Sequence, residues 1–218
     1  SHSGHSHGHG DLSGTRLALA VLVNVILTVA QIVGGVLSGS LALIADAIHN
    51  FSDAASLAIA LVARRISRRD ADETMTFGYS RAEPIAALIN LTTLIIIGVY
   101  LLYEAALRFF SPEPIQGWTV IIVATIALVI DVVTALLVYG PSHGSMNIKA
   151  AFLHNVADAL ASVAVIVSGV VVLFYQIYWA DLAVTVLISA YILFHGFHEI
   201  GRAIKLLMDA VPPGMDLR

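Results

Sequence analysis

Two stretches of this sequence repeat one pattern of side chains that bind metal ions. The pattern is His-Asn, two further residues and Asp, and it occurs at His49–Asp53 and again at His154–Asp158. Residues four apart lie one turn apart on the same face of a helix, so each stretch presents an imidazole beside a carboxylate. Two such faces turned toward each other supply four ligands.

The ligand types favour zinc. Imidazole nitrogen and carboxylate oxygen bind Zn2+ at about 2.0–2.2 Å, and four ligands suit its tetrahedral geometry. Mg2+ and Ca2+ prefer all-oxygen shells, whereas Cd2+, Co2+, Ni2+ and Fe2+ remain alternatives. Because the sequence has no cysteine, thiolate ligands, disulfides and thiol catalysis are excluded. We therefore predict a metal site formed by His49, Asp53, His154 and Asp158.

Both stretches lie in apolar runs, where ionisable side chains are costly. An Asp at the centre of a membrane helix costs roughly 3 kcal/mol, so such residues usually pair or serve a function. A single His in an apolar helix is more often a hydrogen-bonded interior residue than a ligand. Here two His and two Asp form matched pairs, which favours the ligand interpretation.

Other polar residues in these runs leave two interpretations open. Asp46 and Asn50 share a broad helix face with His49 and Asp53, and this face is a candidate lining for the ion path. Asn50 and Asn155 are equally explained as hydrogen-bonding residues between membrane helices.

The same holds for polar residues in the later apolar runs. Asp131 either accepts protons, orients a ligand histidine from outside the site, or hydrogen-bonds between helices. For His195 and His198, plain packing explains the residues better than an accessory metal contact.

The composition is that of a membrane protein. Hydrophobic residues make up 58% of the chain and charged residues 12%, against about a quarter in ordinary soluble domains. The mean hydropathy is +0.88. The net charge of −4 and the lack of a basic stripe argue against nucleic acid as a partner. The lipid bilayer is the expected surrounding.

Six apolar runs are long enough to cross a bilayer as helices, which takes about 20 residues. They lie at 15–37, 41–63, 83–110, 116–139, 147–175 and 179–207. Polar stretches with Gly or Pro, such as 38–40 and 140–142, separate them. The sequence therefore predicts an all-α membrane protein with six transmembrane helices.

Positive charge gathers in alternate connections, as expected for cytoplasmic loops. The residues are Arg16, Arg64, Arg65, Arg68, Arg69, Arg81, Lys149, Arg202, Lys205 and Arg218. The connections 38–40, 111–115 and 176–178 carry no Lys or Arg. Both termini are therefore predicted to face the cytoplasm.

Three segments are expected along the chain. Residues 1–14 form a flexible, His-rich tail, in which His2, His5, His7 and His9 are weak metal ligands. Residues 15–208 form the six-helix transport domain, and 209–218 form a C-terminal tail.

The motifs resemble those of the cation diffusion facilitator family, in particular its zinc-transporting branch. The segment 40–53 resembles the signature of the family's second helix, and 147–158 that of its fifth. Residues 77–84 resemble its loop between the second and third helices. The resemblance covers nearly the whole chain.

The resemblance implies a six-helix transporter, usually a homodimer, that exports metal in exchange for protons by alternating access. It places the transport site at His49, Asp53, His154 and Asp158, a set associated with zinc preference. Many relatives continue into a soluble cytoplasmic domain, which we expect this chain to lack after Arg218. We expect a multi-pass protein of the bacterial inner membrane, not an enzyme. The alternatives are a passive metal channel and a metal-dependent intramembrane enzyme.

Overall fold

The computed structural model describes residues 10–139 and 146–209, and these form six helices. They are α1 Gly10–Ser38, α2 Leu41–Ser67, α3 Ala82–Phe110, α4 Gly117–Tyr139, α5 Met146–Tyr175 and α6 Trp179–Leu207. The prediction of an all-α protein is confirmed, and the helices follow the six apolar runs closely. The helix α1 begins before the apolar run that starts at 15, and α2 continues past 63 through Arg64 and Arg65, since arginine is a good helix former.

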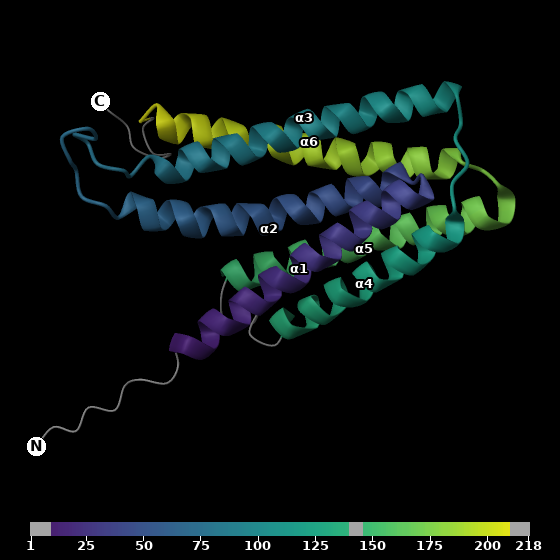
Figure 1. Ribbon diagram of the computed structural model, residues 1–218, viewed down its shortest axis with the longest axis horizontal. Helices are drawn as coiled ribbons and strands as arrows, with labels where there is room; N and C mark the ends of the chain where they lie inside the picture. The colour runs from purple at the N-terminus through teal and green to yellow at the C-terminus, as the bar shows by residue number, and fades with distance from the viewer. Residues whose placement is uncertain (1–9, 140–145, 210–218) are drawn as a thin grey trace, which may run out of the picture.

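Consecutive helices run in opposite directions along one bundle (Figure 1). The short connections 39–40, 111–116 and 176–178 lie at one end, which we call the turn end. The α2–α3 loop, residues 68–81, lies at the other end, which we call the loop end. The helix α2 contacts α1, α3, α5 and α6, so its side chains reach the interior of the bundle.

The α1–α2 turn is fixed by local hydrogen bonds. Gly39 has φ 75°, in the left-handed region that favours glycine. The next residue, Ser40, caps α2, because its hydroxyl accepts a hydrogen bond from the backbone N–H of Leu43 at 3.1 Å. Its own N–H donates to the carbonyl of Gly35 at 3.1 Å. The turn therefore satisfies backbone groups at the end of one helix and the start of the next.

A carboxylate from α6 completes this cap. Asp181 is 1% exposed and accepts hydrogen bonds from the Ser40 hydroxyl at 2.5 Å, the Leu41 N–H at 2.9 Å and the Ala42 N–H at 3.2 Å. The first N–H groups of a helix lack partners within the helix, and the helix dipole there favours negative charge. Asp181 thus ties α6 to α2 at the turn end.

Further contacts close the turn end. The guanidinium of Arg108 donates to the Gly39 carbonyl at 2.7 Å and forms ion pairs with Glu104 at 3.1 Å and Glu113 at 3.3 Å. The N–H of Gln116 donates to the Ser38 carbonyl at 2.9 Å. The α3–α4 connection is therefore bonded to the α1–α2 turn.

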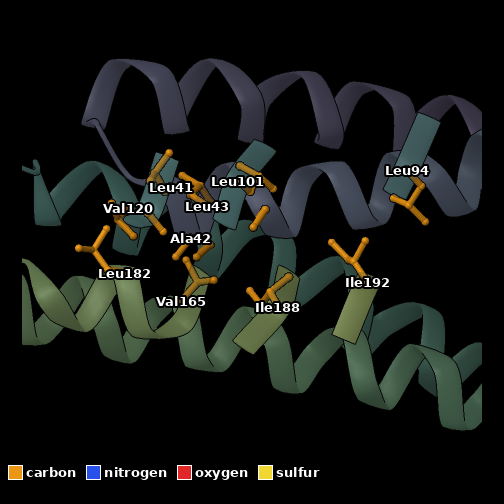
Figure 2. Close-up of a cluster of buried hydrophobic side chains, with 13 residues drawn as sticks. Leu41, Ala42, Leu43, Leu94, Leu101, Val120, Val165, Leu182, Ile188 and Ile192 are labelled. Atoms are coloured by element: carbon orange, nitrogen blue, oxygen red, sulfur yellow. The ribbon is translucent and has the colours of Figure 1, made fainter. Parts of the chain in front are cut away.

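A cluster of buried apolar side chains from five helices fills the bundle toward the turn end (Figure 2). Its most deeply buried large members are Leu43, Leu101, Val120, Val165 and Ile192. At its first residue α4 approaches α5 closely, because Gly117 has no Cβ, and a Cβ there would lie 2.7 Å from the backbone carbonyl of Gly169 in α5.

The distribution of polarity suits a bilayer. Many large apolar side chains are exposed on the outside, whereas the buried polar side chains include Gln31, Asp46, Asn50, Asp131, Asp158 and Asp181. Among the described residues, four stretches are long and apolar enough to cross a membrane: Ala82–Phe110, Gly117–Thr134, Asn155–Tyr175 and Trp179–Leu207. The stretch Val25–Ser38 in α1 is apolar but shorter.

The loop end has its own hydrogen bonds. Asp72 accepts bonds from the side chains of Thr74 and Tyr79, and these bonds hold the pKa of the Asp72 carboxyl well below its usual range. Arg81, which precedes α3, forms an ion pair with Asp209 after α6. The ends of α3 and α6 are thus linked at the loop end.

Candidate metal centre

Three of the four predicted ligands converge inside the bundle. One atom each from His49, Asp53 and Asp158 lies within 4.8 Å of the others. The Nε2 atom of His49 lies 3.2 Å from Oδ1 of Asp158 and 3.7 Å from Oδ2 of Asp53. The helices α2 and α5 therefore bring one imidazole between two carboxylates.

The fourth predicted ligand, His154, belongs to α5 and precedes Asp158 by four residues. This spacing puts both residues on one face of the helix. The side chain of His154 lies outside the part of the chain whose side chains the structure describes. Its role as a ligand remains a prediction.

The surroundings of the three side chains differ in exposure. His49 is 10% exposed by its side chain and Asp158 9%, whereas Asp53 is 40% exposed. The ring of His49 also packs edge-on against Tyr191 of α6, with ring centroids 5.5 Å apart. The buried pair is therefore fixed by packing, and Asp53 is the member reached from outside.

A second group of buried polar residues lies beside this cluster, between α1, α2, α4 and α5. Gln31 donates to Asp46 at 2.7 Å and accepts from Asn50 at 3.3 Å. The Ser162 hydroxyl lies 3.1 Å from Asp131 and 3.4 Å from Asp46. This network links four helices around the cluster.

The network bears on the two open interpretations. Asp46 and Asn50 share the face of α2 that holds His49, but they bond to Gln31, which is fully buried. Asp131 bonds to Ser162 on the neighbouring helix. These contacts fix the rotation and spacing of α2, α4 and α5, which positions the cluster.

A cavity of about 190 Å³ reaches the cluster from the side of α3 and α6. His49 and Asp53 lie on one of its walls, and Tyr191 and His195 of α6 lie on another. The rings of Tyr191 and His195 are in contact, with centroids 4.9 Å apart. His195 therefore faces this cavity, and packing alone does not describe it.

Three residues of this region have no part in the predictions made from the sequence, namely Gln31, Ser162 and Tyr191, and neither does Asp181 at the turn end. Gln31 interrupts an apolar run, which was a usable signal. Ser162 and Tyr191 are unremarkable in a membrane helix, and Asp181 follows a helix start, where acids are common. Only the tertiary structure reveals their partners.

The chain resembles known proteins over most of its length. The family model "cation efflux transmembrane domain" matches residues 17–208. The cation efflux system protein CzcD of an Alcaligenes strain is 37% identical, over 99% of this chain and 68% of that protein. The cadmium, cobalt and zinc/H(+)-K(+) antiporter of Bacillus velezensis is 33% identical, over 98% and 69% of the two chains. The zinc transporter ZitB of Pectobacterium atrosepticum is 36% identical, over 95% and 66%.

Proposed function

Because the chain belongs to the cation efflux family, we propose that it is an exporter of divalent metal, with Zn2+ as its main substrate, in exchange for protons. One observation carries the proposal: His49, Asp53 and Asp158 present one imidazole and two carboxylates within 4.8 Å of one another inside a membrane bundle. With His154 as the fourth ligand, the set matches the tetrahedral preference of Zn2+.

The proposed topology has six membrane spans, with the loop end in the cytoplasm. The four long apolar stretches support it, as does the apolar part of α1. The arginines at the end of α2 support the orientation, since positive charge collects on the cytoplasmic side. The transport unit is residues 15–208, and the homodimer implied by the family resemblance is testable from the mass of the protein in detergent.

Metal binding and proton binding are coupled because both use the same nitrogen atom. The Nε2 atom of His49 faces both carboxylates, and it holds either a proton or a metal ion. When both ring nitrogens carry a proton, the imidazolium donates from Nε2–H to Asp158, and its positive charge partly balances the two carboxylates. A metal ion on Nε2 displaces that proton and leaves a neutral imidazole, with its remaining proton on Nδ1. Binding of Zn2+ and binding of a proton are therefore mutually exclusive at this position, as an antiporter requires.

Transport by the purified protein in liposomes tests the function. With a pH-sensitive dye trapped inside, we expect Zn2+ added outside to move protons in the opposite direction, and Cd2+, Co2+ and Ni2+ to do so more weakly. A passive channel dissipates the zinc gradient without moving protons. An intramembrane enzyme moves neither, and either result contradicts the proposal.

The choice of metal is expected to depend on His49. Replacing it with Asp gives an all-carboxylate edge on α2, which discriminates less between metals by ligand type and geometry. We expect His49→Asp to lower the ratio of Zn2+ to Cd2+ flux by roughly fivefold to tenfold, which corresponds to about 1–1.4 kcal/mol. His198→Asp, the same change at an exposed residue of α6, is the control. An unchanged flux ratio in His49→Asp excludes a role of this imidazole in selectivity.

A further inference from the structure

A second, larger cavity opens at the loop end between α2, α3 and α6. Its volume is about 530 Å³, and its walls carry the charged residues Glu83, Glu199 and Arg202. The smaller cavity at the cluster shares three wall residues with it, namely Ser56, Leu91 and Glu199. The two cavities therefore adjoin, and Glu199 lies at their junction.

Together the two cavities form a route from the loop end to the metal-binding residues, and the order of residues along α6 shows how deep it reaches. Arg202 and Leu206 line only the outer cavity, Glu199 lines both, and His195 and Tyr191 line only the inner one. From Glu199 to Tyr191, which packs against His49, the helix advances about 12 Å. The facing wall on α2 carries Ser56 and then Asp53. Oxygen and nitrogen atoms thus recur along the route from the loop end to the cluster.

The route ends at the metal-binding side chains of His49 and Asp53. Leu94 and Ile192 line the inner cavity, and both belong to the buried apolar cluster that extends from there to the turn end (Figure 2). Beyond it, Asp181 and Arg108 bond the helix ends together. The described side chains therefore leave the metal-binding residues accessible from the loop end and block access to them from the turn end.

Glu199 is the acid placed to meet a cation on this approach. Its carboxylate accepts a hydrogen bond from Nη1 of Arg202 at 2.8 Å, and the two side chains are 40% and 66% exposed. Among the described residues, only His49, Asp53 and Asp158 form a group of three or more metal-binding side chains. Glu199 and His195 are thus positions on a route and not a second complete metal site.

We propose that Glu199 captures the incoming divalent cation at the junction of the two cavities, and that Arg202 competes with the cation for this carboxylate. The proposal rests on the proposed function, since it describes how the exported metal reaches the site. A negative group in a cleft raises the local concentration of cations and so speeds their entry. A cation at Glu199 replaces the guanidinium and then passes to Asp53 and His49.

Zinc transport in liposomes, measured over a range of Zn2+ concentrations at low salt, tests this proposal. We expect Glu199→Gln to raise KM about threefold to tenfold with kcat unchanged, because it removes attraction without touching the transport site. Arg202→Gln is expected to lower KM. Both effects shrink in 0.5 M salt, since the screening length falls to a few ångströms at molar salt.

A matched control lies at the turn end. Glu113 also pairs with an arginine, Arg108, and Glu113→Gln removes the same charge from the opposite end of the bundle. We expect its KM to equal that of the unaltered protein. The proposal is overturned if Glu199→Gln leaves KM unchanged, if Arg202→Gln raises KM, or if the shifts persist unchanged in high salt. Each of these outcomes presupposes that the unaltered protein transports zinc. If the unaltered protein shows no zinc flux, the result contradicts the proposed function instead.

Discussion

Asp158→Asn is expected to abolish zinc transport, with a loss of at least about 100-fold in kcat/KM, because even residues that only support a metal ligand cost 10–100-fold when changed. The substitution keeps the size of the side chain and leaves an amide oxygen for the position of Oδ1, which lies 3.2 Å from Nε2 of His49. It removes the negative charge that a divalent ion needs in a dry bundle. Zinc-driven proton movement in liposomes measures the effect.

Two further variants separate loss of the ligand from loss of the fold. Ser168→Ala removes another buried polar group of α5, whose hydroxyl donates, within the described part of the chain, to the Val165 carbonyl of its own helix, and it is expected to transport normally. Asp158→Asn itself is expected to elute as the unaltered protein does in size-exclusion chromatography. Zinc flux at the normal rate in a folded Asp158→Asn protein rules out this carboxylate as a ligand.

The helices were largely predictable because a bilayer leaves the chain little choice. Backbone groups in hydrocarbon must bond within the segment, so a long apolar run there becomes a helix. The end of α2 was placed too early, since apolar content marks the edge of the hydrocarbon and not the last helical turn. Which distant helices pair was not predictable: α3 lies against α6 and α1 against α4, and no local pattern encodes these contacts.

The candidate site was predictable as far as helical periodicity reaches. The four-residue spacing placed His49 beside Asp53, and the repeated motif on another helix indicated a partner edge, which Asp158 now supplies. The supporting residues were not predictable. Gln31 and Ser162 act through partners on other helices, and a single Gln or Ser in an apolar run is compatible with many packings.

The role of Asp181 was the least predictable from the sequence, because its partners lie about 140 residues earlier in the chain. It bonds α6 to the start of α2 at the turn end, where further hydrogen bonds also join the connections. The larger cavity between these two helices opens at the loop end, and the smaller one adjoins it at His49 and Asp53. Helices held together at one end separate most easily at the other, so this cap sets where α2 and α6 can part.

Asp181→Ala is therefore expected to destabilise the whole bundle. It leaves Ser40 in place as the N-cap but leaves the N–H groups of Leu41 and Ala42 buried without their carboxylate acceptor, at about 1–3 kcal/mol each. A total of about 2–6 kcal/mol lowers the apparent Tm by roughly 5–20 °C for a chain of this length. Thermal unfolding in detergent measures the shift.

Asp209→Ala, which removes an exposed carboxylate from its ion pair with Arg81, is expected to change Tm by only a degree or two, since exposed pairs contribute about 0–1 kcal/mol. Equal shifts in the two variants contradict the assignment of Asp181 as the cap that joins α6 to α2.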